Sequence, residues 1–171
     1  LAGDLGSGKS TVAGLIIERN GAETYSTGAI VRRLAEENGV DVVEMNHLME
    51  TNPVYDKMVD DSLVALSDVD KMMVIDSRMA WHFVRGNFSV YLTTDLDVSA
   101  ARIYAAKRGQ ESFDTVEDTA KKMKERKSSE NTRYLEKYGV NCKDLANYNL
   151  VIDTTYAEPQ EICERILSGA E

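Results

Sequence analysis

The chain has 171 residues, a length that suits one domain with a single buried core. Its 43% hydrophobic and 29% charged residues are ordinary for a globular protein, and the net charge is −9. This acidic total argues against a nucleic-acid polymer as partner, because such binding depends on many basic contacts to the backbone. No apolar run approaches the about 18 residues of a membrane span and no signal peptide is visible, so we expect no membrane partner and a cytoplasmic location.

Strands and amphipathic helices alternate along the chain, which predicts an α/β fold. Expected strands are residues 1–2, 23–26, 71–76, 88–93 and 150–152; expected helices are residues 9–19, 27–37, 42–51, 54–66, 98–107, 114–138 and 159–167. Because the chain begins abruptly at Leu1, we expect the first strand to be cut short. Continuous apolar runs such as Lys71–Asp76 indicate strands buried on both faces, hence a parallel sheet with helices on both sides.

The first motif lies between the first strand and the first helix. Gly3–Ser10 reads GDLGSGKS and fits GxxxxGK[ST] in full, the pattern of a phosphate-binding P-loop. Its glycines let the backbone wrap a phosphate, and its N–H groups and the positive helix end face the anion. Lys9 would reach the β- and γ-phosphates of ATP, and the Ser10 hydroxyl would bind Mg²⁺. The alternative is a chance glycine turn.

A second anion site is predicted where the second strand meets its helix, at Tyr25–Arg33. Thr27 can cap this helix, whose N-terminus, with Gly28, offers a weak anion site. Arg32 lies between one and two turns further on and could clamp a phosphate. Thr27 could equally be a plain cap, and we expect only one of the adjacent Arg32 and Arg33 to be functional.

Two polar residues follow the apolar run Met72–Ile75. Asp76 closes that strand, where P-loop proteins hold the metal, often through water. Arg78 stands just past the strand end, where open α/β sheets bind ligands, so we expect it to bind phosphate. The alternative for Asp76 is a turn cap.

The charges are unevenly distributed. Residues 41–70 carry a local charge of −7, whereas residues 121–133 carry +4. The basic segment is a candidate flap that closes over the reacting groups and excludes water. Arg126 and Arg133 are two helical turns apart and share a face, so we expect both to clamp phosphate. We interpret Lys121, Lys122 and Lys127 as a solvated face, and we expect Arg102 on the preceding helix to stack on adenine or on the flap.

These features favour a small kinase among P-loop proteins. The NKxD motif of a GTPase is absent, and so is an ABC-type signature. Transfer to a small acceptor would need little covalent chemistry from the protein. The groups expected to share the charge of the transferring phosphoryl are Mg²⁺, Lys9, Arg78, Arg126 and Arg133. Rival hypotheses are a P-loop kinase for another small molecule and a kinase-fold module that binds nucleotide without turnover.

The two cysteines, Cys142 and Cys163, are expected to be reduced thiols.

Nearly the whole chain resembles the cytidylate kinase-like family, closest to its short archaeal-type branch. The similar segments are GDLGSGKS followed by TVAGLI, YSTGAIVRRLAEENG, VEMNHLMETNPVYDKMVDD, VIDSRMAWHF and ERKSSENTRYLEKYGVNCKDLANYNLVIDTT. The last of these is the more specific match, because a P-loop alone is widespread.

This resemblance implies a fold and a set of roles. The fold would be a P-loop three-layer sandwich with a five-stranded parallel sheet in the order 2-3-1-4-5. It would be a single kinase domain over 1–171, with an acceptor-binding segment at about 27–68 and a lid at about 109–133. ATP would be held by Gly6, Ser7, Gly8, Lys9, Ser10 and Thr11, with Arg102 and Thr154 near the adenine. Thr27, Gly28, Arg32 and Arg78 would bind a nucleoside monophosphate, most readily CMP or dCMP. We expect a monomer or weak homodimer.

Overall fold

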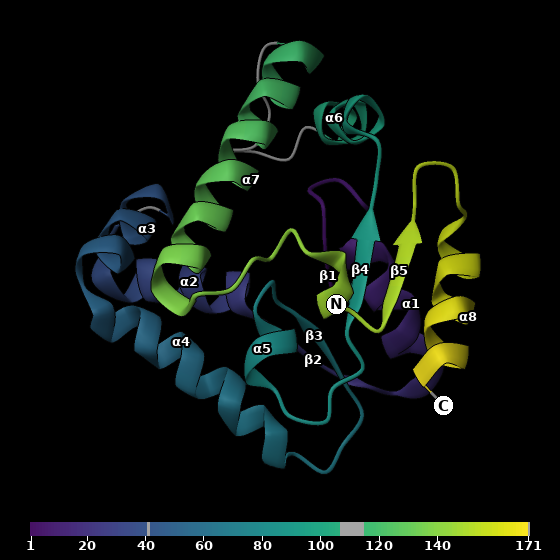
Figure 1. Cartoon of the computed structure of the whole chain (residues 1–171), viewed down its shortest axis with the longest axis horizontal. Helices are drawn as coiled ribbons and strands as arrows, with labels where there is room; N and C mark the ends of the chain where they lie inside the picture. The colour runs from purple at the N-terminus through teal and green to yellow at the C-terminus, as the bar shows by residue number, and fades with distance from the viewer. Residues whose placement is uncertain (41, 107–114, 171) are drawn as a thin grey trace.

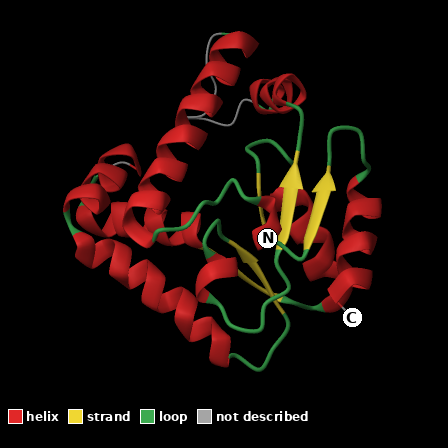
Figure 2. Ribbon diagram, in the orientation of Figure 1, coloured by secondary structure: helices red, strands yellow, loops and turns green. Residues whose placement is uncertain are grey.

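The computed structural model describes residues 1–40, 42–106 and 115–170 and has the expected α/β organisation (Figures 1 and 2). The strands are β1 Ala2–Gly3, β2 Glu23–Ser26, β3 Met73–Asp76, β4 Val90–Thr93 and β5 Leu150–Asp153. The α-helices are α1 Lys9–Asn20, α2 Thr27–Asn38, α3 Val42–Thr51, α4 Pro53–Ala65, α5 Ala80–Phe83, α6 Leu96–Ala105, α7 Val116–Tyr138 and α8 Pro159–Ala170. Two 3₁₀ helices, η1 Leu66–Asp68 and η3 Leu145–Asn147, complete the described elements.

The strands form two parallel ladders, and the expected single five-stranded sheet is not confirmed. One ladder has the order β1-β4-β5 and the other pairs β2 with β3. Leu1 lies between them: its nitrogen donates to the Ile75 carbonyl oxygen (2.7 Å), and its carbonyl oxygen accepts from the Ser77 N–H (3.3 Å). All pairings are parallel, so the carboxyl ends of the strands gather at one edge.

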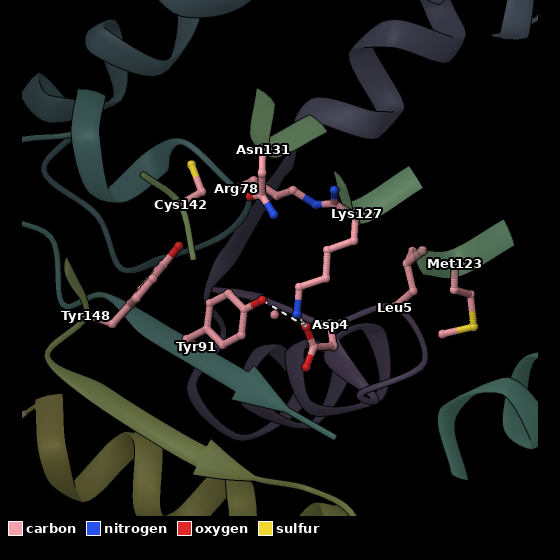
Figure 3. Close-up of a pocket in the computed structure, with 10 residues that line it drawn as sticks. Asp4, Leu5, Arg78, Tyr91, Met123, Lys127, Asn131, Cys142 and Tyr148 are labelled. Atoms are coloured by element: carbon pink, nitrogen blue, oxygen red, sulfur yellow. Dashed lines mark hydrogen bonds and ion pairs between the residues drawn. The ribbon is translucent and has the colours of Figure 1, made fainter. Parts of the chain in front are cut away.

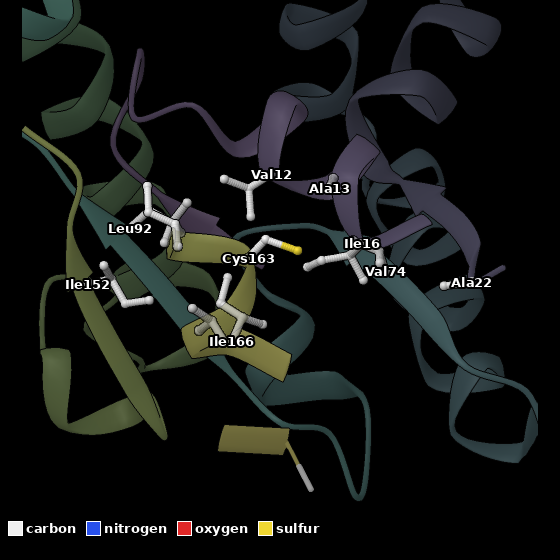
Figure 4. Close-up of a cluster of buried hydrophobic side chains, with 11 residues drawn as sticks. Val12, Ala13, Ile16, Ala22, Val74, Leu92, Ile152, Cys163 and Ile166 are labelled. Carbon is white, nitrogen blue, oxygen red and sulfur yellow. The ribbon is translucent and has the colours of Figure 1, made fainter. Parts of the chain in front are cut away.

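Helices α1 and α8 cover one face of the strands, as Figure 4 shows. Val12 and Ile16 of α1 and Ile166 of α8 pack there with Leu92 and Ile152. The opposite face is covered by Trp81 of α5 and by Tyr148, which pack against Ala2, Tyr91 and Val151. Neighbours on one strand therefore face opposite layers, as strand geometry requires, and the prediction of a sheet buried on both faces is confirmed.

Most element boundaries agree with the sequence to within a few residues. The predicted break at Asn52-Pro53 is confirmed: the Asn52 side chain accepts from the Val54 N–H (3.1 Å), and Pro53 begins α4. Helix α6 starts at Leu96, two residues earlier than expected, because the Asp95 carboxylate caps the N–H groups of Asp97 and Val98. The short helix α5 was not predicted.

Two helical regions extend from the strands. Helices α2, α3 and α4 enclose a small core of their own, which includes Leu34, Met45 and Val59. Helix α7 packs on α6 through Met123, Ala100 and Ile103, and its far end reaches α4 (Figure 1). Within the described part of the chain, no helix combines the length and the apolar character that crossing a membrane requires.

Candidate active site

The P-loop joins β1 to α1 with the geometry that an anion site requires. Gly8 precedes α1 in the left-handed region (φ 83°), and a Cβ added there would meet no atom of the described residues within 4 Å. Gly6 is also left-handed (φ 72°), but a Cβ there would lie 2.8 Å from the Ser99 carbonyl oxygen. Gly6 is therefore needed for close packing against α6, whereas Gly8 turns the chain beside open space. The first N–H groups of α1, those of Lys9, Ser10 and Thr11, have no partner within the helix.

Lys9 folds back over this loop. Its Nζ donates to the carbonyl oxygens of Gly3 (3.0 Å) and Asp4 (2.7 Å). Burial, followed by the nearby charge of Arg78, lowers the pKa of Lys9 from 10.5 to about 8, while the carboxylates of Asp76 and Asp4 oppose that shift. A buried ammonium among other cations favours an anion, because phosphate oxygens would restore the charged form.

Ser10 and Asp76 supply the oxygen donors expected for a metal. Ser10 opens α1, Asp76 ends β3, and Asp76 is close enough to Lys9 to act on its pKa. A hydroxyl and a carboxylate are hard donors of the kind Mg²⁺ prefers, and Mg²⁺ usually keeps several waters and needs few protein ligands. The pair fits that ion, and no cluster of three or more His, Cys, Asp or Glu occurs among the described residues to suggest another.

Arg78 and Arg126 meet at one carboxylate. Glu130 of α7 forms an ion pair with the Arg78 guanidinium and another with Nε of Arg126 (3.2 Å). The Arg78 side chain is largely buried, and burial lowers its pKa. Both arginines also act on the charge of Lys9, so residues from β1–α1, β3–α5 and α7 converge on one electropositive site. The structure thus brings together Lys9, Arg78 and Arg126, three of the four residues predicted to share the charge of the transferring group, and their catalytic role stays a prediction.

Three further basic residues of α7 have different partners. The guanidinium of Arg133 lies over the ring of Tyr134, 5.3 Å from its centroid. Lys122 forms an exposed i,i+3 pair with Glu125 (3.2 Å), as expected of a solvated face. Lys127 does not fit that expectation. Its Nζ lies 2.5 Å from Oδ1 of Asp4, in the P-loop.

Arg102 joins the P-loop to the segment after β5. Its guanidinium donates to the carbonyl oxygens of Thr154 (3.0 Å), Thr155 (2.9 Å) and Gly6 (3.4 Å). The Thr154 hydroxyl points inward and donates to the Thr93 carbonyl oxygen (2.9 Å). Arg102 and Thr154 are thus neighbours, and Thr154 contacts the Arg102 guanidinium through its backbone carbonyl oxygen and not through its side chain.

The start of α2 differs from the prediction in one respect. Ser26 is the N-cap: it is extended, and its Oγ accepts from the Ala29 N–H (3.4 Å), so Thr27 is the first helical residue and does not cap the helix. Gly28 lies beside Arg32, whose Nη1 is 3.6 Å from the position of a Cβ on Gly28. Arg33 forms an exposed pair with Glu37 (3.5 Å). Arg32 and Arg33 therefore have different surroundings, and the expectation that only one of them is functional stays a prediction.

A small cavity of about 40 Å³ lies beside Arg78 and the P-loop, and its lining includes Tyr91 and Tyr148, which the sequence did not single out (Figure 3). Tyr91 points into it and donates to Oδ1 of Asp4 (2.9 Å), and burial raises the pKa of this tyrosine. The sequence also suggested no role for Asp4, which lines this cavity, or for Glu130, which pairs with Arg78 and Arg126. The i,i+4 spacing of Arg126 and Glu130 was a usable signal, whereas the contacts of Asp4 join residues far apart in the chain.

Comparison with known proteins supports a kinase assignment. The family model described as "Cytidylate kinase-like family" matches residues 1–156. A cytidylate kinase of Methanobrevibacter smithii is 32% identical over 168 residues, which cover 98% of this chain and 95% of that protein. A cytidylate kinase of Methanothermobacter thermautotrophicus is 33% identical over 154 residues, 90% of this chain and 92% of that protein. The crystal structure of a shikimate kinase from Bacteroides thetaiotaomicron has the same fold, with a TM-score of 0.61 at 14% identity over 98% of this chain and 94% of that one.

A match over most of the chain, together with a P-loop lysine beside converging arginines, identifies the family. This chain belongs to the cytidylate kinase-like family.

Proposed function

We propose that this protein transfers a phosphoryl group from ATP to a nucleoside monophosphate, with CMP and dCMP as the preferred acceptors. The observation that carries the proposal is the convergence of Lys9 with Arg78 and Arg126, from three separate segments, beside the open turn at Gly8. The acceptor class follows from the archaeal relatives, which are named cytidylate kinases and match this chain over 90% or more of its length.

The donor phosphates would lie in the P-loop. The N–H groups after Gly8 bind them, and Lys9 leaves the carbonyl oxygens of Gly3 and Asp4 to reach the β- and γ-phosphates. Mg²⁺ would be held by Ser10 and Asp76, and when bound it neutralises charge on the phosphate oxygens. Arg102 and the backbone of Thr154 would border the adenine.

The acceptor would lie between α2 and Arg78. Thr27, Gly28 and Arg32 would bind its phosphate together with Arg78, which orients the attacking oxygen toward the γ-phosphorus. Since that oxygen is already anionic, the protein needs no strong general base. Arg126 and Arg133 would approach from α7 and share the charge that is spread over the transferring group. Glu130 must give up part of its contact with the arginines for this to happen.

The domain boundaries belong to the same proposal. Residues of about 27–68 would form the acceptor-binding segment, and their separate core around Met45 supports this. Residues of about 109–133 would form the lid, although 107–114 lie outside the described residues. The proposed order of the complete sheet remains 2-3-1-4-5, supported by the bonds of Leu1 to Ile75 of β3 and to Ser77 just after that strand. The proposed state is a monomer or weak homodimer.

A panel of acceptors tests the function. The purified protein would be given ATP and Mg²⁺ with CMP, dCMP, UMP, AMP, GMP or shikimate, and ADP release would be measured. We expect the highest kcat/KM with CMP or dCMP. A preference for another nucleotide would change the acceptor, and a preference for shikimate would reject the monophosphate site. ATP binding by calorimetry without ADP release in any arm would support the non-catalytic alternative.

A further inference from the structure

The carboxylate of Asp4 joins three parts of the molecule. Its Oδ1 accepts from the Tyr91 hydroxyl (2.9 Å) and from Nζ of Lys127 (2.5 Å), and its Oδ2 accepts from the Thr94 N–H (3.2 Å). Figure 3 shows Lys127 reaching down from α7 toward Asp4, and Tyr91 pointing to it from β4. The side chain of Asp4 is 16% exposed and that of Lys127 is 48% exposed. Asp4 is thus oriented by fixed groups, while its lysine partner comes from a separate helix.

The P-loop does not need this carboxylate to keep its own shape. Ser7 closes the turn through the Asp4 backbone, because its N–H and its hydroxyl both donate to the Asp4 carbonyl oxygen (3.3 and 2.8 Å). The Asp4 side chain is left to act between the loop and α7. The same helix also touches the loop through Met123, which belongs to the apolar cluster that contains Leu5.

Lys127 occupies a decisive place on α7. It follows Arg126 directly and precedes Glu130 by three residues, and Glu130 pairs with both Arg78 and Arg126. An anchor at Lys127 therefore sets the height and rotation of the helical turn that carries the phosphate-binding arginine. A half-exposed ion pair is weak enough to open for nucleotide exchange, since ion pairs in contact with water add little to stability.

We propose that Asp4 and Lys127 form a positioning contact that holds α7 over the P-loop and sets Arg126 at the site of phosphoryl transfer. The inference rests on the proposed function, and it assigns Lys127 a role that its neighbours Lys121 and Lys122 do not share. By keeping the lid seated, the pair also excludes water, which would otherwise compete with the acceptor for the γ-phosphoryl group.

The test compares Lys127→Met, Asp4→Asn and the double variant with the wild type. Asn at position 4 can still accept from Thr94 and contact the Tyr91 hydroxyl, but it lacks the charge that binds Lys127. We expect each single variant to lower kcat/KM for CMP about three- to tenfold, in line with a lost partly exposed ion pair, and to raise the ratio of ATP hydrolysis to transfer. The double variant should be no worse than either single one.

Three measurements separate positioning from a loss of stability. Lys127→Arg keeps the charge and should stay within about twofold of the wild type. Lys122→Met removes a lysine of the same helix whose ion pair, within the described part of the chain, is with Glu125, and it should change neither kcat/KM nor the hydrolysis ratio. The melting temperatures of all variants should agree closely. Multiplicative losses in the double variant, or a Lys127→Met enzyme indistinguishable from Lys122→Met, would overturn the proposal.

Amide hydrogen exchange of residues 116–138 with ATP and Mg²⁺ gives a readout that does not depend on turnover. Faster exchange in Lys127→Met than in Lys122→Met supports the contact, and equal exchange refutes it. Failure of the wild type to phosphorylate any nucleotide in the same experiment would instead reject the proposed function and leave the exchange result to decide on the contact.

Discussion

The P-loop and α7 contribute to the same site but are built in different ways. The P-loop is local: Gly6, Gly8 and Lys9 lie within four residues, and the conformation follows from glycine geometry and the start of a helix. The active face of α7 depends on contacts with distant residues, Arg78 to Glu130 and Asp4 to Lys127. The first kind of structure is encoded within one motif, whereas the second exists only once the chain has folded.

The comparison predicts a difference in what mutations do. Changes in the P-loop should remove function because the loop has no substitute. Changes on α7 should each lower activity only in part, because several charged side chains together stabilise the transferring group.

Lys9→Ala should have the largest effect. It removes the cation that reaches the β- and γ-phosphates, and we expect turnover to fall by about 10³-fold, the loss of a preorganised charge at the reacting group. The fold should persist, because the hydrogen bonds that the Lys9 ammonium makes among the described residues are to carbonyl oxygens of its own loop. Turnover with CMP and the melting temperature provide the measurement. Lys71→Ala, at an exposed lysine paired with Glu23, is the control, and near-normal turnover in Lys9→Ala would reject the P-loop mechanism.

Arg78→Ala should follow, with a loss of about 10²-fold in kcat/KM for CMP, since it removes a donor to the acceptor phosphate or the transferring group. Arg78→Lys should recover only part of this, because lysine lacks the planar fork of the guanidinium. Arg85→Ala is the matched control: Arg85 lies in the same β3–β4 connection but is exposed and pairs with Asp68. Equal kinetics for Arg78→Ala and Arg85→Ala would remove Arg78 from the site.

The sequence predicted the local structures better than those that depend on contacts between distant residues. The P-loop, the strand faces and the helix break at Asn52-Pro53 were predictable, because each depends on residues within a few positions of one another. The cap of α2 was assigned one residue too late: Ser26 and Thr27 are both good capping residues, and only the extended backbone at Ser26 distinguishes them.

The charges of α7 could not be read in the same way. Lys121, Lys122 and Lys127 look alike in the sequence, and the Lys127–Asp4 contact arises only in the folded chain, where Met123 of the same helix packs in one cluster with Leu5. Nor could helical spacing reveal that Arg78, 52 positions before Glu130, would share that carboxylate with Arg126. The five-stranded sheet was expected from the resemblance alone, and the described strands form two ladders.

The pH dependence of catalysis tests the P-loop side of this comparison next, because burial and the nearby charge of Arg78 lower the pKa of Lys9 to about 8. Above this pH the free protein loses the Lys9 charge, so kcat/KM for ATP should fall about tenfold per pH unit. Bound phosphates favour the ammonium form, so kcat should decline only at higher pH. Rates measured from pH 6.5 to 10 test this. A decline of kcat at the same pH as kcat/KM would contradict it.

The same shift has a consequence for stability. Because the pKa of Lys9 is lowered in the folded protein, the unfolded chain binds more protons between about pH 8 and 10.5, and the contribution of Lys9 to the free energy of unfolding rises with pH in that window. Lys9→Met should flatten this rise. Denaturant titrations of both proteins at pH 7.5 and pH 10 measure the difference.

The smallest effects should come from the adjacent arginines of α2, which separate a binding role from a surface role within one helical turn. Arg32→Ala should raise KM for CMP about fivefold, because it would remove one of several cationic contacts to the acceptor phosphate. Arg33→Ala removes only the exposed pair with Glu37 and should change stability by less than about 0.5 kcal/mol and kinetics not at all. Steady-state kinetics with varied CMP decide between them. If Arg33→Ala raised KM and Arg32→Ala did not, the acceptor phosphate would lie on the other side of α2. Arg33 would then replace Arg32 as its ligand.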